Sequence, residues 1–73
     1  MNCAEIYREI LRKQNKKQRQ AADELGISRQ ALWGRISYKS LTVNTADSMF
    51  RKLGYKMIVV PAGKELEAGE YEI

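Results

Sequence analysis

One glycine constrains the fold of this 73-residue chain more than any other residue. Gly26 ends a segment in which small and apolar residues recur at helical spacing, at Ala21, Ala22 and Leu25. A glycine in this place favours the left-handed conformation that terminates an α-helix. Ser28 follows two residues later and can cap the start of another helix with its side-chain oxygen. The chain is therefore predicted to turn sharply between two short helices, at about residues 17–25 and 29–37.

The second of these helices combines an apolar inner stripe with a polar first turn. Leu32 and Ile36 are four residues apart and share one face. The first turn, Ser28-Arg29-Gln30, carries groups that can hydrogen-bond to base edges and phosphates. Two short helices joined in this way have the layout of a helix-turn-helix, whose second helix lies in the DNA major groove.

Two further helices are expected, one on each side of this motif. The first covers about residues 3–14 and begins with an Asn2-x-x-Glu5 capping box. The last begins after Thr42 and ends at about residue 53, before Gly54. Asn15 is either a turn residue or the cap of the second helix, since Gln18 stands three positions later. Spacing predicts buried stripes in the first helix (Cys3, Ile6, Tyr7, Ile10, Leu11) and in the last (Ala46, Met49, Phe50, Leu53).

The character of the sequence changes after Gly54. Residues 55–60 are β-branched, aromatic or apolar and end at Pro61, which predicts a strand. Residues 70–73 alternate and predict a second strand, and a turn of helix is possible at 65–68. Because both faces of the first strand are apolar, the helices can cover only one of them. A second copy of the chain is expected to cover the other, with an interface formed by Met57, Ile58, Val59, Val60, Tyr71 and Ile73.

The charge of the chain is distributed unevenly. Residues 1–56 hold twelve Lys or Arg and five Asp or Glu, so 12 − 5 gives +7. Residues 57–73 hold one Lys and four Glu, so 1 − 4 gives −3, and the two parts sum to the net charge of +4. A basic body with an acidic tail suggests that the body contacts a polyanion and the tail points away from it. Solvated helix surfaces would account for the basicity about equally well without the helix-turn-helix pattern.

Composition excludes several other classes of protein. Histidine is absent and Cys3 is the single cysteine, which argues against an internal disulfide, a zinc site and the commonest acid–base chemistry. The chain is therefore not expected to be an enzyme or to hold a metal or cofactor. No segment reads as a membrane span or signal peptide, so a cytoplasmic protein is expected. At this length one domain is expected, with residues 1–54 as its core and 55–73 as a dimerisation segment.

The motif resembles the phage repressor/Cro-type (XRE) helix-turn-helix family over about residues 6–53. The resemblance rests on Gln18, Ala22, the turn Leu25-Gly26-Ile27-Ser28 and the segment Arg29-Gln30-Ala31-Leu32. It departs from the family at Lys16 and Lys17, where an apolar residue and a capping Thr are usual, and at Arg35, where an inner residue is usual. The fold class it implies is mainly α with a small C-terminal β element. This would be a four-helix repressor-like domain followed by one or two dimerising strands.

The resemblance also implies which residues bind DNA. Base readout would come from Ser28, Arg29, Gln30 and Trp33, while Gln18 would bind a phosphate. The expected phosphate contacts are completed by Lys17, Arg19, Arg35, Tyr38 and Lys39. Trp33 is one residue off the inner stripe, so spacing allows it either to pack in the core or to face DNA.

The expected function is that of a transcriptional regulator of bacterial or phage origin. It would bind a near-palindromic operator in double-stranded DNA as a homodimer, with its third helix in the major groove. No small-molecule ligand is expected. The alternative is an antitoxin or another protein-interaction module whose acidic C-terminal tail binds a partner protein.

Overall fold

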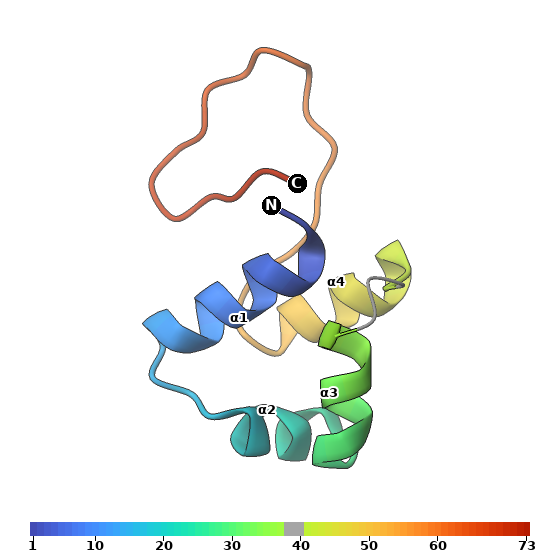
Figure 1. Cartoon of the computed structure of the whole chain (residues 1–73). Helices are drawn as coiled ribbons and strands as arrows, with labels where there is room; N and C mark the ends of the chain where they lie inside the picture. The colour runs from blue at the N-terminus through green and yellow to red at the C-terminus, as the bar shows by residue number, and fades with distance from the viewer. Residues whose placement is uncertain (38–40) are drawn as a thin grey trace.

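The computed structural model describes residues 1–37 and 41–73, and within them the fold is mainly helical. Its four helices are α1 (Cys3–Lys13), α2 (Gln18–Leu25), α3 (Arg29–Ser37) and α4 (Val43–Arg51). Figure 1 shows α2 and α3 at one end of the molecule and the C-terminal segment as a wide loop at the other. The helical part of the predicted fold class is confirmed.

The start of α1 is fixed by local chemistry. Asn2 accepts a hydrogen bond from the Glu5 backbone N–H at 2.8 Å, and the Glu5 carboxylate accepts one from the Asn2 N–H at 3.2 Å. This is the predicted capping box, which satisfies N–H groups that have no partner within the helix. At the other end Asn15 has a φ of 55° and serves as a turn residue. The cap of α2 is Lys17, whose N–H donates to the Gln20 side chain at 2.9 Å, so the alternative in which Asn15 caps α2 is wrong.

A single apolar core lies between the four helices. Tyr7 and Phe50 face each other in it, with ring centroids 6.0 Å apart at a tilt of 57°. The Gln14 side chain donates to the Leu53 carbonyl at 3.0 Å, and Arg8 donates to the Ile36 carbonyl, so polar bonds connect α1 to the ends of α3 and α4. The predicted stripes are buried apart from Cys3 and Leu25, which are half-buried. The core consists of Ala4, Ile6, Tyr7, Ile10, Leu11, Ala21, Ala22, Leu32, Ile36, Ala46, Met49, Phe50 and Leu53.

The last helix begins as expected and ends slightly earlier. Thr42 caps α4 by accepting a hydrogen bond from the Thr45 N–H at 3.2 Å. The helix stops at Arg51 instead of residue 53, because the chain tightens into a turn in which the Leu53 N–H bonds to the Phe50 carbonyl at 2.8 Å. Leu53 is still buried, so the predicted stripe is formed although the helix is shorter.

The strands expected after Gly54 are not found in residues 41–73 of this chain. Residues 55–60 run as irregular chain, and 70–73 do not pair with them. The N–H of Met57 donates to the Asp47 side chain at 2.9 Å, so this donor is not available to a neighbouring strand. Residues 65–68 form no helical turn. Two tight turns are found instead, one before this segment and one at its end. In the first the Lys64 N–H bonds to the Pro61 carbonyl, and in the second the Glu70 N–H bonds to the Glu67 carbonyl.

The C-terminal segment contacts the helical body near both of its ends. At its start, Met57 is tied to Asp47 of α4, and Asp47 also accepts from Arg51 at 2.7 Å. Near its end, the Tyr71 ring lies 6.3 Å from the Tyr55 ring and 5.1 Å from the Lys13 ammonium. The residues between these anchors are exposed and form the wide loop.

Candidate nucleic-acid interface

The turn between α2 and α3 is formed by backbone geometry. Gly26 has a φ of 68°, in the left-handed region that costs residues with a Cβ free energy. The Gly26 N–H bonds to the Asp23 carbonyl and the Ile27 N–H to the Ala22 carbonyl, each at 3.1 Å, which closes the end of α2. Ser28 Oγ then accepts from the Ala31 N–H at 3.0 Å and caps α3. Both predictions about this turn are confirmed.

The first turn of α3 presents its polar side chains to solvent. Ser28, Arg29 and Gln30 are all exposed, whereas Leu32 and Ile36 are buried against the body. The helix is therefore held from one side, and its other side is accessible to a large ligand. Arginine and glutamine can each form bidentate hydrogen bonds, to guanine and adenine respectively.

The position of Trp33 removes one of the two readings allowed by spacing. Its side chain is 55% exposed, so it does not pack in the core beside Leu32. Tryptophan is enriched among the residues that contribute most to binding energy at interfaces, so an exposed Trp33 is compatible with a binding surface. It extends the exposed surface of α3 by one helical turn beyond Gln30.

The start of α2 contributes a second group of polar side chains. Lys17 and Arg19 are exposed and Gln18 is half-buried, so the three can contact a ligand laid against α2 and α3. Lys16 differs, because its ammonium bonds to both carboxylate oxygens of Glu24, at 2.9 and 3.0 Å. That ion pair connects the beginning of α2 to its end.

Arg35 is less accessible than Arg29. It is half-buried and close enough to the buried Tyr7 hydroxyl to influence its ionisation. Burial, together with the charge of Glu24, raises the pKa of Tyr7 to about 12, and the positive charge of Arg35 opposes this rise. Arg35 is therefore a less accessible candidate for a phosphate contact than Arg29. Tyr38 and Lys39, the other expected phosphate contacts, lie outside the described residues.

Gly34 is a feature of α3 that the prediction of site residues did not use, although the sequence shows it. It stands inside the helix, where glycine costs about 0.5–1 kcal/mol of stability relative to alanine. Its backbone is not left-handed, in contrast to Gly26. The helix forms nonetheless, since Leu32 and Ile36 bury its inner face.

The residues expected at a dimer interface fall into two groups. Ile58, Val59, Val60 and Ile73 are exposed, with Val59 fully so at 101%. Met57 and Tyr71 are half-buried and pack against the core of their own chain. Asp47, which positions Met57, was not identified from sequence, because its partner is ten residues away in an irregular segment.

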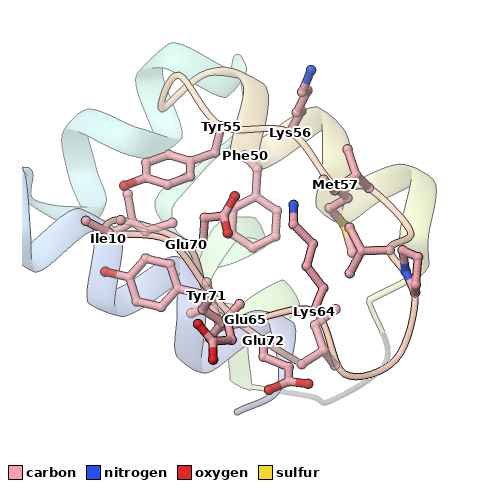
Figure 2. A pocket seen from close by; sticks show the side chains of 18 of the residues that line it. Ile10, Phe50, Tyr55, Lys56, Met57, Lys64, Glu65, Glu70, Tyr71 and Glu72 are labelled. Carbon is pink, nitrogen blue, oxygen red and sulfur yellow. The ribbon is translucent and has the colours of Figure 1, made fainter.

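A hollow of about 510 Å³ lies between the C-terminal loop and the helical body (Figure 2). Ile10 and Phe50 form part of its floor, and Tyr55 and Tyr71 line it from the two ends of the loop. Ile58 and Val60 line the hollow, while the intervening Val59 does not. Within residues 58–60, the side chains of Ile58 and Val60 therefore border the hollow, and the side chain of Val59 is in contact with solvent.

Neither a cluster of metal-ligating residues nor a membrane-spanning helix is found within residues 1–37 and 41–73. These residues bring together no group of three or more His, Cys, Asp or Glu that could hold a metal ion. None of the helices in this part of the chain has both the length and the apolar character needed to cross a membrane.

The chain was compared with protein-family models, with curated proteins and with solved structures. The chain matches no family model, no curated protein and no solved structure.

Proposed function

We propose that this protein is a sequence-specific DNA-binding regulator of the repressor/Cro type. The observation that carries the proposal is the exposed polar first turn of α3, Ser28-Arg29-Gln30, held in place by the Gly26 turn and by buried Leu32. In this proposal α3 enters the major groove, Arg29, Gln30 and Trp33 contact base edges, and Lys17, Gln18 and Arg19 contact phosphates.

A homodimer is part of the proposal. The exposed apolar residues Ile58, Val59 and Val60 follow one another on an irregular segment. Pairing of this segment with its copy would give the backbone the strand partner that a single chain lacks. Two α3 helices would then reach successive major grooves about 34 Å apart, which favours a near-palindromic site.

The position of the acidic segment agrees with this arrangement. Figure 1 shows the C-terminal loop at the end of the molecule opposite α2 and α3. Glu65, Glu67, Glu70 and Glu72 would therefore be kept away from the phosphates contacted by α2 and α3. This separation reduces repulsion between the tail and DNA.

The test begins with a duplex selected from random DNA by the protein, or taken from the region upstream of its own gene. Arg29→Ala and Gln30→Ala should each weaken specific binding by about 1–3 kcal/mol and leave the melting temperature nearly unchanged. Arg12→Ala on α1 is the matched control for loss of one exposed positive charge. Lys17→Ala should weaken binding to selected and scrambled duplexes alike. An unchanged ratio of specific to random binding in both α3 variants would show that α3 does not read the sequence.

Salt dependence gives a second measurement. If each subunit neutralises about three to five phosphates, log K against log salt for the dimer should have a slope of roughly −5 to −9. A flat dependence would instead favour a protein-interaction module. That second candidate rests on the exposed apolar residues Ile58, Val59 and Leu66, which stand beside four glutamates and suit a partner with an apolar, basic surface.

A further inference from the structure

Gly34 is a glycine that the described part of the fold does not require. Its φ lies outside the left-handed region, so any residue can adopt its backbone conformation. A Cβ added there would meet no atom within 4 Å among the described residues, apart from its two chain neighbours and the helix's own backbone. Alanine would therefore fit the chain and favour the helix more strongly.

The contrast with Gly26 shows what a structurally required glycine looks like. Gly26 has a φ of +68° and ends α2, so a side chain there would be strained. Gly34 has no such role, and α3 is held in place independently of it. Leu32 is completely buried on one side of it, and Arg8 bonds to the Ile36 carbonyl on the other.

Gly34 is half-buried and lies next to exposed side chains of α3. It lies four residues after Gln30 and three after Ala31, so these residues are its neighbours on the helix surface. Gln30 and Ala31 are exposed, and the exposed Trp33 directly precedes Gly34. A surface without a Cβ is useful where another molecule must approach a backbone closely.

We propose that Gly34 is a close-approach point at which the DNA backbone packs against α3. Without a side chain at this position, α3 can lie deeper in the major groove, and Gln30 and Trp33 can reach the base edges. Gly34 acts in this way as a positioning residue that makes no hydrogen bond of its own. The inference rests on the proposed DNA-binding function and adds to it a steric determinant of specific binding.

The test uses Gly34→Ala and Gly34→Leu in the full chain. Gly34→Ala should raise the melting temperature by about 2–8 °C, because alanine favours the helix. The same variant should weaken binding to the selected duplex by roughly 5- to 100-fold, and Gly34→Leu should weaken it further. Binding to scrambled DNA should change less, because it depends mainly on charge. Ser48→Ala and Ser48→Leu place the same two side chains at an exposed position of α4 and should leave DNA binding unchanged.

The outcomes separate the inference from the function on which it rests. If the unmodified chain binds the selected duplex and Gly34→Ala binds it equally well, the close-approach role is wrong while the proposed function stands. If Gly34→Ala lowers the melting temperature and the helical circular dichroism, the glycine has a structural role and the inference is wrong. If the unmodified chain binds no duplex DNA, both are wrong. A more stable Gly34→Ala variant that binds the selected duplex more weakly supports the inference.

Discussion

The helical body and the C-terminal segment differ in how far their apolar side chains are buried. Every buried residue described in the chain lies between Ala4 and Leu53. After Gly54 the apolar side chains are largely exposed, including Ile58 at 60%, Val59, Val60, Leu66 and Ile73. A single chain therefore buries the apolar residues of the body in its own core. The apolar residues of the tail remain largely exposed to water in a single chain.

This difference indicates where the two regions obtain their stability. Burial of apolar area stabilises the body by roughly 25 cal/mol for each Å² removed from water. The tail relies on a few anchors, namely the Asp47 bond to Met57 and the tilted ring pair of Tyr55 and Tyr71 beside Lys13. Changes in the body should affect folding, and changes in the exposed tail should affect association.

The largest effect is expected in the core. Phe50→Ala should lower the free energy of unfolding by about 3–5 kcal/mol, because it leaves a cavity where the ring faces Tyr7. Urea unfolding followed by circular dichroism measures this change. Leu66→Ala, which truncates an exposed apolar residue of the tail, should change it by less than about 0.5 kcal/mol. Comparable losses in both variants would contradict the division between the two regions.

The next effect concerns association. Sedimentation at about micromolar concentration should give twice the chain mass of 8.4 kDa. Ile58→Asp should weaken the dimer at least about 100-fold, or about 2.7 kcal/mol, since a carboxylate would enter an apolar interface. Helical circular dichroism should be retained. Ala68→Asp, an acidic substitution at another exposed tail position, is the control. A monomer that binds palindromic DNA tightly would remove the argument for a dimer through this segment.

A slightly smaller effect should appear at alkaline pH. The pKa of Tyr7 is raised from 10.0 to about 12 by burial. The folded state therefore holds this proton more tightly than the unfolded state. The resulting stability is complete below pH 10 and is lost as the pH rises towards 12, by about 2–3 kcal/mol. Tyr7→Phe should abolish this part of the alkaline destabilisation, and Tyr55→Phe should not. Identical pH profiles for the unmodified chain and Tyr7→Phe would contradict the prediction.

The smallest effect is expected at the junction between the two regions. The Arg51 side chain, and then the Met57 N–H, hold the pKa of Asp47 below its ordinary value of 3.8. The anchor is therefore present above that pH and is lost as the pH falls through the lowered value. The amide resonance of Met57 should shift as the pH is lowered from about 6 to about 2. Asp47→Asn should remove this pH response without unfolding the body, whereas Asp23→Asn should preserve it. A Met57 resonance that does not respond to pH would show that the anchor is absent in solution.

Much of the helical body could be predicted from the sequence because its determinants are local. The caps at Asn2, Ser28 and Thr42 bond to residues three positions away, so a short window of sequence contains both partners. The same holds for the Gly26 turn and for buried stripes repeated at three and four residues. The exposed first turn of α3, Ser28-Arg29-Gln30, depends on these local features alone, so the sequence predicts it residue by residue.

Contacts between distant segments decided the rest. Trp33 could be placed outside the core only once Leu32 and Ile36 were seen to bury the inner face of α3. The strand propensity of residues 55–60 is real in the sequence, but a strand also needs a paired backbone, and the Met57 N–H bonds to Asp47 instead. Tyr71 packs beside Tyr55 at the start of the tail and beside Lys13 at the end of α1, two residues that are far from it in the sequence. The sequence by itself determined the helices, the caps at Asn2, Ser28 and Thr42 and the exposed turn of α3, because those depend on neighbours along the chain. The tertiary structure alone decided the path of the tail and the exposure of Trp33, because those depend on which distant groups compete for the same surface and the same hydrogen bonds.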